Sequence, residues 1–278
     1  MSLGLEITPQ QADRLLDSLS EIAAHAAAAT LATSFSEVER RTKADQSPVT
    51  AADEASEAII VEGVNRLLPG VPVVAEESVA RAAASLEPSF ISVDPLDGTK
   101  EFLDGRDEYT VNIAIVTHGV PIAGLIAAPK QGLLWRGVVG IRAELMQLKF
   151  NEGNACVSAP SSIHTRKAPQ QLTAATSRSH LDRDSENLLT RLKVGKRYSR
   201  GSSVKFCHLA QGDADIYPRL APTREWDIAA GHAILAAAGG TVTAPGGGAI
   251  RFGQTAQKFL IPGFIAWGDP ALAAATKL

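Results

Sequence analysis

The chain contains few cysteines and no surplus of either charge, and each scarcity excludes a class of protein. Among its 278 residues only Cys156 and Cys207 are cysteines. They are too few for a disulfide framework and their spacing fits no metal motif, so we expect two reduced, buried thiols. Lys and Arg total 27 and Asp and Glu total 30, a formal net charge of −3. This balance gives no general reason to bind nucleic acid or an anionic membrane, although a local basic pocket for phosphate remains open.

Long apolar runs and several well-known motifs are also missing. The Ala-rich stretch around His25 is too short and too weakly apolar to span a bilayer, and the N-terminus lacks the pattern of a secretory signal. We therefore predict a cytoplasmic protein with no membrane insertion. No Rossmann or Walker glycine pattern lies between a strand and a helix, and no Ser or Cys lies in a nucleophile motif. No internal repeat is visible.

Hydrophobic periodicity divides the chain into helical and extended segments. Apolar residues recur at helical spacing after Thr8 and again after Thr50, and Asp53 is placed to complete a capping box with Thr50. Residues 40–48, between these two helices, are predicted to form a polar loop. Further helices are predicted at residues 185–192, 203–211 and 225–238, and strands at 71–75, 90–93, 110–117, 122–128, 133–139, 145–150, 172–176 and 215–217.

The order of these elements predicts sheets covered by helices rather than a regular alternating barrel. A chain of 278 residues can form one large domain or two compact halves. Residues 159–169 are rich in Ser, Pro and basic residues, which is typical of a link. We therefore divide the chain into an N-terminal half, residues 1–157, and a C-terminal half, residues 158–278.

The strongest local signal is the sequence DPLDGT, which begins at Asp94. Asp94 and Asp97 follow an apolar strand, and the proline between them stiffens the turn so that both carboxylates can face one point. Carboxylates and a backbone carbonyl are the ligands that Mg²⁺ prefers. Gly98 allows close approach of the backbone, and Thr99 opens a short helical segment whose free N–H groups suit a phosphate. The alternative interpretation is an Asx turn that caps a helix.

Three other acids support the chemical interpretation, although each has a structural alternative. Glu76 ends an apolar run, where sites built on sheets gather, but it could be a solvated loop acid. Asp227 lies at the start of the last long helix, where it could simply favour the helix dipole. Asp53 could serve only as a capping residue.

Four motifs occur in the order and approximate spacing of the inositol monophosphatase superfamily. They are TAAD at 50–53, AEES at 75–78, DPLDGT at 94–99 and WDIAAG at 226–231. From about residue 45 to its end the chain resembles this superfamily. The resemblance implies a layered αβαβα fold of the α+β or α/β class, a requirement for two or three Mg²⁺ ions, and inhibition by lithium.

Finer features resemble one branch, the CysQ-type 3′(2′),5′-bisphosphate nucleotidases. Inositol monophosphatases usually have TNF where this chain has KEF at residues 100–102. One departure is Ser199-Arg200 before Gly201, where a shorter apolar residue is expected. The segments that carry the resemblance are KEF at 100–102, EYTVNI at 108–113, TSRSH at 176–180, GSSVKFC at 201–207 and IYPR at 216–219.

The resemblance also implies roles for individual residues. Asp94 would bridge two metal ions, and Glu76 and the Thr99 hydroxyl would orient the attacking water, with Asp53 behind them. Lys205 and Arg219 could instead be surface charges, and His180 a loop histidine. The implied metal ligands are Glu76, Asp94, the Leu96 carbonyl, Asp97 and Asp227. The implied substrate-binding residues are Glu76, Leu96, Asp97, Gly98, Thr99, Ser177, His180, Gly201, Ser202, Ser203, Lys205, Arg219 and Asp227.

The resemblance implies an enzyme that removes the 3′-phosphate of adenosine 3′,5′-bisphosphate, leaving AMP, with the sulfated relative of this nucleotide as a second possible substrate. Two alternatives remain. One is a phosphatase of inositol or another sugar phosphate on the same scaffold, and the other is a non-catalytic nucleotide-binding protein. We expect a small nucleotide bisphosphate as the partner, no nucleic acid, and a monomer or homodimer.

Overall fold

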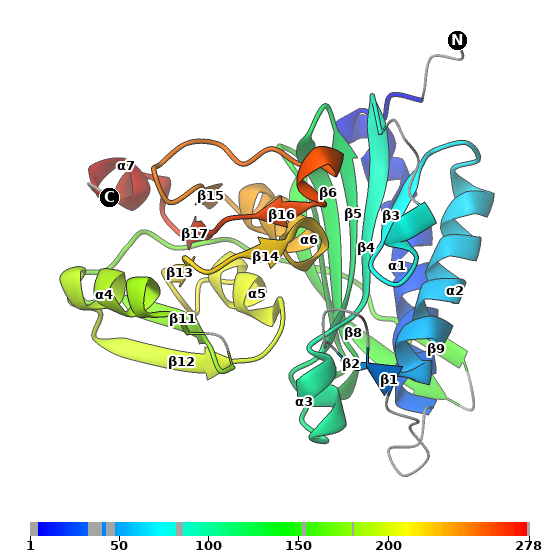
Figure 1. Ribbon diagram of the computed structural model, residues 1–278, viewed down its shortest axis with the longest axis horizontal. Helices are drawn as coiled ribbons and strands as arrows, with labels where there is room; N and C mark the ends of the chain where they lie inside the picture. Colours follow the sequence, from blue (N-terminus) through cyan, green and yellow to red (C-terminus); the bar gives the residue numbers. More distant parts are fainter. Residues whose placement is uncertain are drawn as a thin grey trace.

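The computed structural model describes residues 5–32, 41–42, 48–81, 86–151, 154–179 and 181–276 (Figure 1). Its elements form five layers, which run from two long helices through a large sheet, a helical layer and a smaller sheet to two short helices. The layered αβαβα arrangement predicted from the sequence is therefore confirmed. No helix in the described parts of the chain is long and apolar enough to cross a membrane.

The first layer consists of α1 (Pro9–Ala32) and α2 (Ala51–Leu67). Leu16, Leu19 and Ala23 lie on the buried face of α1 and pack with Ile60 of α2 in one hydrophobic cluster against the large sheet. Helical spacing of these apolar side chains gives one continuous stripe toward the core, which explains why the periodicity predicted both helices.

The large sheet is antiparallel except at one edge, where β3 lies parallel to β4. The strand order is β10-β8-β7-β6-β5-β4-β3, and β9 pairs with β8. Central strands are buried on both faces, so they carry apolar runs rather than an alternating pattern. The strands are β3 (Val73–Ala75), β4 (Ser89–Asp97), β5 (Thr110–Thr117), β6 (Val120–Ala128), β7 (Leu133–Val138), β8 (Arg142–Asn151), β9 (Asn154–Val157) and β10 (Ser161–Ser162).

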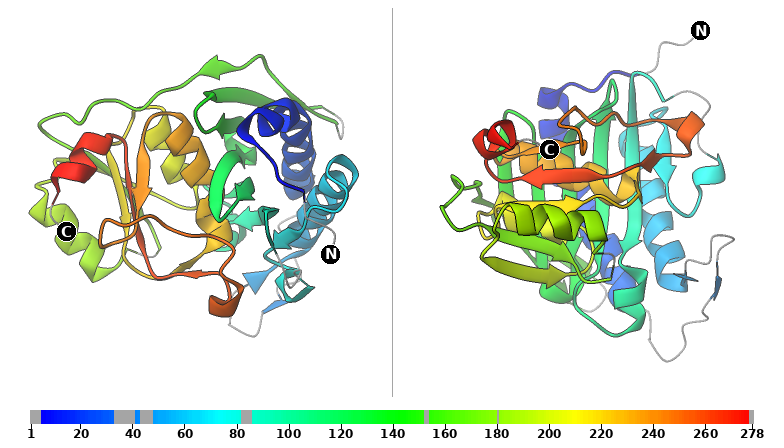
Figure 2. Two further views of the ribbon diagram at one scale, coloured as in Figure 1. Left: turned by 90° about the horizontal axis from the view of Figure 1, so that it is seen from above. Right: turned by 60° about the vertical axis from the view of Figure 1, so that its left-hand side comes forward.

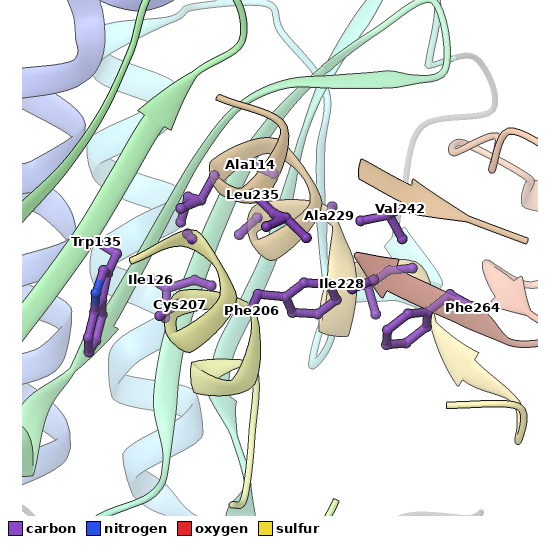
Figure 3. Close-up of a cluster of buried hydrophobic side chains, with 14 of the residues drawn as sticks. Ala114, Ile126, Trp135, Phe206, Cys207, Ile228, Ala229, Leu235, Val242 and Phe264 are labelled. Atoms are coloured by element: carbon purple, nitrogen blue, oxygen red, sulfur yellow. The ribbon is translucent and has the colours of Figure 1, made fainter. Parts of the chain in front are cut away.

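The middle layer contains α5 (Val204–Ala210) and α6 (Glu225–Ala237), which lie between the two sheets (Figure 2, left). Figure 3 shows part of this core, where the rings of Phe206 and Phe264 stack with centroids 5.3 Å apart. Helix α6 comes so close to β6 that a β-carbon on Gly124 would overlap the backbone of Ala230. A glycine is therefore needed at this contact.

The second sheet has the order β12-β11-β13-β17-β15, and α4 (Arg183–Arg191) and α7 (Pro270–Ala275) cover its outer face. Its strands are β11 (Thr173–Ser177), β12 (Lys196–Arg200), β13 (Ile216–Arg219), β15 (Thr241–Thr243) and β17 (Phe264–Trp267). The smaller elements are β1 (Arg41–Thr42), β2 (Pro48–Val49), α3 (Thr99–Leu103), β14 (Thr223–Arg224), β16 (Leu260–Ile261) and the short 3-10 helices Val79–Arg81, Pro129–Gln131 and Thr255–Gln257.

Two expectations need correction. Residues 40–48 were predicted to be a loop, but β1 and β2 form a short antiparallel pair there; residue 40 and residues 43–47 lie outside the described parts of the chain. Cys207 is buried as expected, whereas Cys156 is exposed. The division of the chain after residue 157 stays a prediction. The pairing of β10 with β8 shows that the large sheet continues to Ser162.

Candidate active site

The DPLDGT segment ends β4 with an irregular turn. The pairing of β4 with β5 shifts register between Asp94 and Asp97, an irregularity that changes the direction of side chains near a strand end. The Leu96 amide donates to Asp94 Oδ1 at 3.0 Å, which forms an Asx-type turn. This turn does not cap α3, whose N-cap is Gly98 with no side-chain cap hydrogen bond. Gly98 has φ 93°, a left-handed conformation that favours glycine, and it directly precedes α3. The turn therefore presents both carboxylates and the start of a helix at one place.

Glu76, Asp94 and Asp227 form a cluster of carboxylates. One oxygen of each lies within 4.8 Å of the others. Glu76 follows β3, and its amide donates to Val93 O at 3.2 Å, which holds it next to the residue that precedes Asp94 in the parallel strand β4. Asp227 comes from the first turn of α6, where its carboxylate accepts hydrogen bonds from the Thr223 hydroxyl and, at 3.1 Å, from the Arg224 amide. Acids more than 130 residues apart are thus brought together by the layered fold.

Burial and the crowding of the acids raise the pKa values of Asp94 and Asp97. Asp94 is 1% exposed, and burial, followed by repulsion from Glu76, Asp97 and Asp227, holds its pKa well above the usual range. Burial and the neighbouring Asp227 raise the pKa of Asp97 to about 7. Buried carboxylates in mutual repulsion are stabilised by a cation, and a set of oxygen donors alone fits a hard divalent ion such as Mg²⁺. The residues therefore fit the ion that the sequence implies.

Asp53 lies behind this cluster and uses its two oxygens differently. Oδ2 accepts the Thr50 amide at 2.8 Å and the Thr50 hydroxyl at 2.6 Å, completing the capping box of α2. Oδ1 lies 3.4 Å from the Thr99 hydroxyl, which is also 3.3 Å from Leu96 O. The structural and the functional interpretations of Asp53 therefore describe different atoms of one carboxylate.

The acids line a cavity of about 490 Å³ that also receives side chains from the second sheet and from α5. Lys205, on α5, is 3% exposed, and its amino group donates to the carbonyls of Ser202 and Arg200, the latter at 3.4 Å. Burial lowers the pKa of Lys205 to about 8, although the nearby Asp97 opposes this change. Arg219, on β13, also lines the cavity and donates to Pro222 O at 3.3 Å. The expectation that both could be surface charges is thus wrong for Lys205, because it is buried.

Most sequence-predicted site residues line this single cavity. Asp53 does not line it and reaches it through Thr99, whereas His180 lies outside the described residues. The sequence interpretation missed four lining residues. All four lie within the motifs KEF, IYPR and WDIAAG, which already carry the family resemblance. Their position in these motifs could have predicted that they line the cavity. The predicted residues on the cavity wall are Glu76, Asp94, Leu96, Asp97, Gly98, Thr99, Ser177, Gly201, Ser202, Ser203, Lys205, Arg219 and Asp227, and the missed ones are Lys100, Glu101, Tyr217 and Ile228.

Comparison with known proteins identifies the family. The sequence matches the inositol monophosphatase family over residues 12–276. The chain belongs to the inositol monophosphatase family. The 3′(2′),5′-bisphosphate nucleotidase CysQ of Escherichia coli (strain K12) is 39% identical over 231 residues, which cover 80% of this chain and 86% of that protein.

Solved structures support the same family fold. CysQ from Bacteroides thetaiotaomicron, described as a bacterial member of the family, has a TM-score of 0.73 at 33% identity and covers 90% of this chain and 95% of its own. An inositol monophosphatase from Anabaena (Nostoc) sp. PCC 7120 also has a TM-score of 0.73, at 25% identity, with 95% of both chains covered. The family and the fold predicted from the sequence motifs are therefore confirmed.

Proposed function

We propose that this protein is a Mg²⁺-dependent phosphomonoesterase that hydrolyses the 3′-phosphate of adenosine 3′,5′-bisphosphate to give AMP and phosphate. The observation that carries the proposal is the charge arrangement of one cavity. Four carboxylates, from Glu76, Asp94, Asp97 and Asp227, share this cavity with the cationic side chains of Lys205 and Arg219. A ligand with two phosphates can use both kinds of group, one through a bound cation and the other by direct ion pairing.

The chain's own residues have defined tasks in this reaction. Glu76, Asp94, the Leu96 carbonyl, Asp97 and Asp227 would hold the metal ions. When bound, Mg²⁺ supplies positive charge for the phosphate and lowers the pKa of a water molecule. The amides of Gly98 and Thr99, at the start of α3, would hold the phosphate that is cleaved.

A proton path is available behind the phosphate position. The Thr99 hydroxyl lies within reach of Asp53 Oδ1 and Leu96 O, so its hydrogen can be directed away from the cavity. Its oxygen is then free to accept a hydrogen bond from the attacking water. Glu76, which follows the neighbouring parallel strand β3, would orient the same water. No covalent intermediate with the protein is required.

The similarity to proteins named as 3′(2′),5′-bisphosphate nucleotidases supports the choice of substrate, because that match covers most of both chains. The similarity to an inositol monophosphatase structure keeps a sugar-phosphate substrate as the second candidate. The motif KEF at residues 100–102 favours the first, since Lys100 and Glu101 both line the cavity.

A phosphate-release assay tests the proposal. The protein is incubated with adenosine 3′,5′-bisphosphate, its sulfated relative, inositol 1-phosphate and fructose 1,6-bisphosphate, each with Mg²⁺ and with excess chelator. We expect the nucleotide bisphosphate to have the highest kcat/KM, activity to disappear with chelator and to return with added Mg²⁺, and Li⁺ to inhibit. A higher kcat/KM for inositol 1-phosphate would favour the second candidate, and full activity in chelator would refute the metal requirement.

A further inference from the structure

Residues 108–113, the start of β5 and the two residues before it, have one apolar and one polar face. Tyr109, Val111 and Ile113 are fully buried in hydrophobic clusters on the side of α2 and α1. Successive side chains of an extended chain point to opposite sides, so Glu108, Thr110 and Asn112 share the other face. The sequence motif EYTVNI at 108–113 is therefore a strand pattern, and its polar half has no part in the proposed metal site.

The polar face contacts one wall of the cavity, the segment Gly201–Ser203 that leads into α5. Ser203 Oγ donates to Asn112 Oδ1 at 2.7 Å and lies 2.8 Å from Thr110 Oγ1. The Gly201 amide donates to Glu108 Oε2 at 2.8 Å. The segment is thus attached at both ends to side chains of the N-terminal half, although it is about 90 residues away in the chain.

Glu108 is itself held by an arginine from the C-terminal half. Arg178 Nε and Nη2 donate to its two oxygens at 3.0 and 2.7 Å, a two-point contact, and Arg178 Nη2 also donates to Ser199 O at 3.0 Å. Glu108 is 6% exposed. Burial opposes its charge, but the hydrogen bonds from Arg178 and from the Gly201 amide outweigh that effect and lower its pKa. The carboxylate therefore joins the end of β12 to the start of the cavity wall.

The attachment leaves no room for a side chain at residue 201. A β-carbon there would stand 2.7 Å from Glu101 Cγ and 3.0 Å from Glu108 O. Glu101 itself accepts a hydrogen bond from Ser179 Oγ at 2.8 Å. The position of the wall also fixes Lys205, because its amino group donates to the carbonyls of Ser202 and Arg200.

We infer that Glu108 is a positioning residue that sets substrate specificity by fixing the Gly201–Ser203 wall and, through it, the amino group of Lys205. The inference rests on the proposed function. Glu108 does not line the cavity, so it acts on the substrate only through these residues. Its effect should fall on the phosphate that is not cleaved, since the cleaved one is assigned to the acids and to Gly98 and Thr99.

Kinetics with two substrates that differ only in that phosphate test the inference. Adenosine 3′,5′-bisphosphate and adenosine 3′-monophosphate are compared in the wild-type protein, Glu108→Gln and Arg178→Lys. We expect either substitution to raise KM for the bisphosphate about 10-fold or more, the effect of a lost charge-assisted hydrogen bond, with little change in kcat. KM for the monophosphate should stay within about twofold of wild type.

The pair Arg166–Asp215 gives a matched control within the same fold. Asp215 is buried, receives two hydrogen bonds from Arg166, at 2.8 and 3.0 Å, and accepts the Thr173 amide at 2.7 Å. These contacts resemble those of Glu108, but the amide that Asp215 holds belongs to Thr173, which does not line the cavity, whereas Glu108 holds the amide of the lining residue Gly201. Asp215→Asn and Arg166→Lys should therefore lower thermal stability without changing the ratio of the two KM values.

Hydrogen exchange provides a readout that does not depend on the substrate. Amide exchange of peptides covering residues 199–206 should be faster in Glu108→Gln and Arg178→Lys than in wild type, and unchanged in Arg166→Lys. Equal changes in both KM values, or unchanged exchange at 199–206, would overturn the inference. Failure of the proposed function would appear differently, as a wild-type protein that hydrolyses neither nucleotide, and the exchange measurement would still decide the role of Glu108.

Discussion

Asp53 contacts two different parts of the molecule with its two carboxylate oxygens. Oδ2 caps α2 through Thr50, and Oδ1 faces the Thr99 hydroxyl. A capping box is visible in a sequence because its partners are three residues apart, whereas the contact with Thr99 spans 46 residues and depends on the fold. Sequence patterns therefore predicted the cap, and only the family resemblance suggested the contact with Thr99.

The substitution Asp53→Asn separates the two roles. An Asn side chain can keep one oxygen for the Thr50 amide, so the cap should survive and the melting temperature should stay close to wild type. Its NH₂ group would then face Thr99, which could no longer donate its hydrogen in that direction. We expect kcat to fall by about 10²-fold or more, as measured in the phosphate-release assay.

Two comparisons sharpen this test. Thr99→Val should lower kcat similarly, and the double variant should lose much less than the product of the two losses, because both residues act as one unit. Asp269 also caps a helix, accepting the Ala271 amide at 2.9 Å. Asp269→Asn should leave kcat unchanged. Normal kcat in Asp53→Asn at saturating Mg²⁺ would reduce Asp53 to a capping residue.

The lowered pKa of Glu108 predicts that the stability of the fold depends on pH. Because its pKa is lower in the folded protein than its usual 4.5, it stabilises the fold above pH 4.5, and this stabilisation is lost as the pH falls through the lowered value. The melting temperature of Glu108→Gln should therefore lie below that of wild type at pH 7, and the difference should narrow below pH 4.5. A constant difference across this range would show that the charge of Glu108 does not stabilise the fold.

At the scale of elements, sequence patterns predicted the helices and strands that have a strong hydrophobic period or clear boundaries. The helices α1 and α6 and the strands β5 and β6 carry long apolar stripes or runs, and they are found as predicted. The hydrophobic pattern did not predict the strand β12, whose residues are KRYSR. Its side chains are largely exposed at the edge of the second sheet, so backbone pairing with β11 forms it without any apolar signal. The strands after residue 240 are two to four residues long, too short for a period to be visible.

The contact between α6 and β6 depends on one glycine. Because a β-carbon on Gly124 would overlap the backbone of Ala230, Gly124→Ala should force the helix away from the sheet and cost about 1–3 kcal/mol of unfolding free energy. Gly246 is a suitable control, since a β-carbon there meets nothing within 4 Å. Denaturant unfolding should therefore distinguish the two alanine variants, and equal stabilities would contradict the close packing of α6.

At the scale of the whole molecule, the layered fold brings acids from distant segments to one point. Glu76 follows β3, Asp94 lies in β4 and Asp227 lies in α6, so the edge of the large sheet and the helical layer between the sheets both contribute. Their sequence motifs predicted them as site residues, but spacing along the chain could not show that Lys205 would be buried in the same cavity wall. Its burial results from the packing of α5 between the two sheets, a contact of long range.

This arrangement predicts that Mg²⁺ stabilises the protein. It also predicts that the effect of one substitution on the melting temperature changes sign when Mg²⁺ is added. Without metal, Asp94 is repelled by three neighbouring acids, so Asp94→Asn should raise the melting temperature in excess chelator. With Mg²⁺ at about 100 times its Kd, the wild-type protein should gain about 2.7 kcal/mol, and the variant should gain much less because it lacks a ligand charge. The two proteins should therefore exchange the order of their melting temperatures when Mg²⁺ is added.

Asp104→Asn, which removes an exposed acid, is the control and should respond to Mg²⁺ as wild type does. An equal gain in Asp94→Asn and wild type would mean that the ion binds elsewhere, because a carboxylate at the centre of the cluster cannot be neutralised without weakening a cation that the cluster holds.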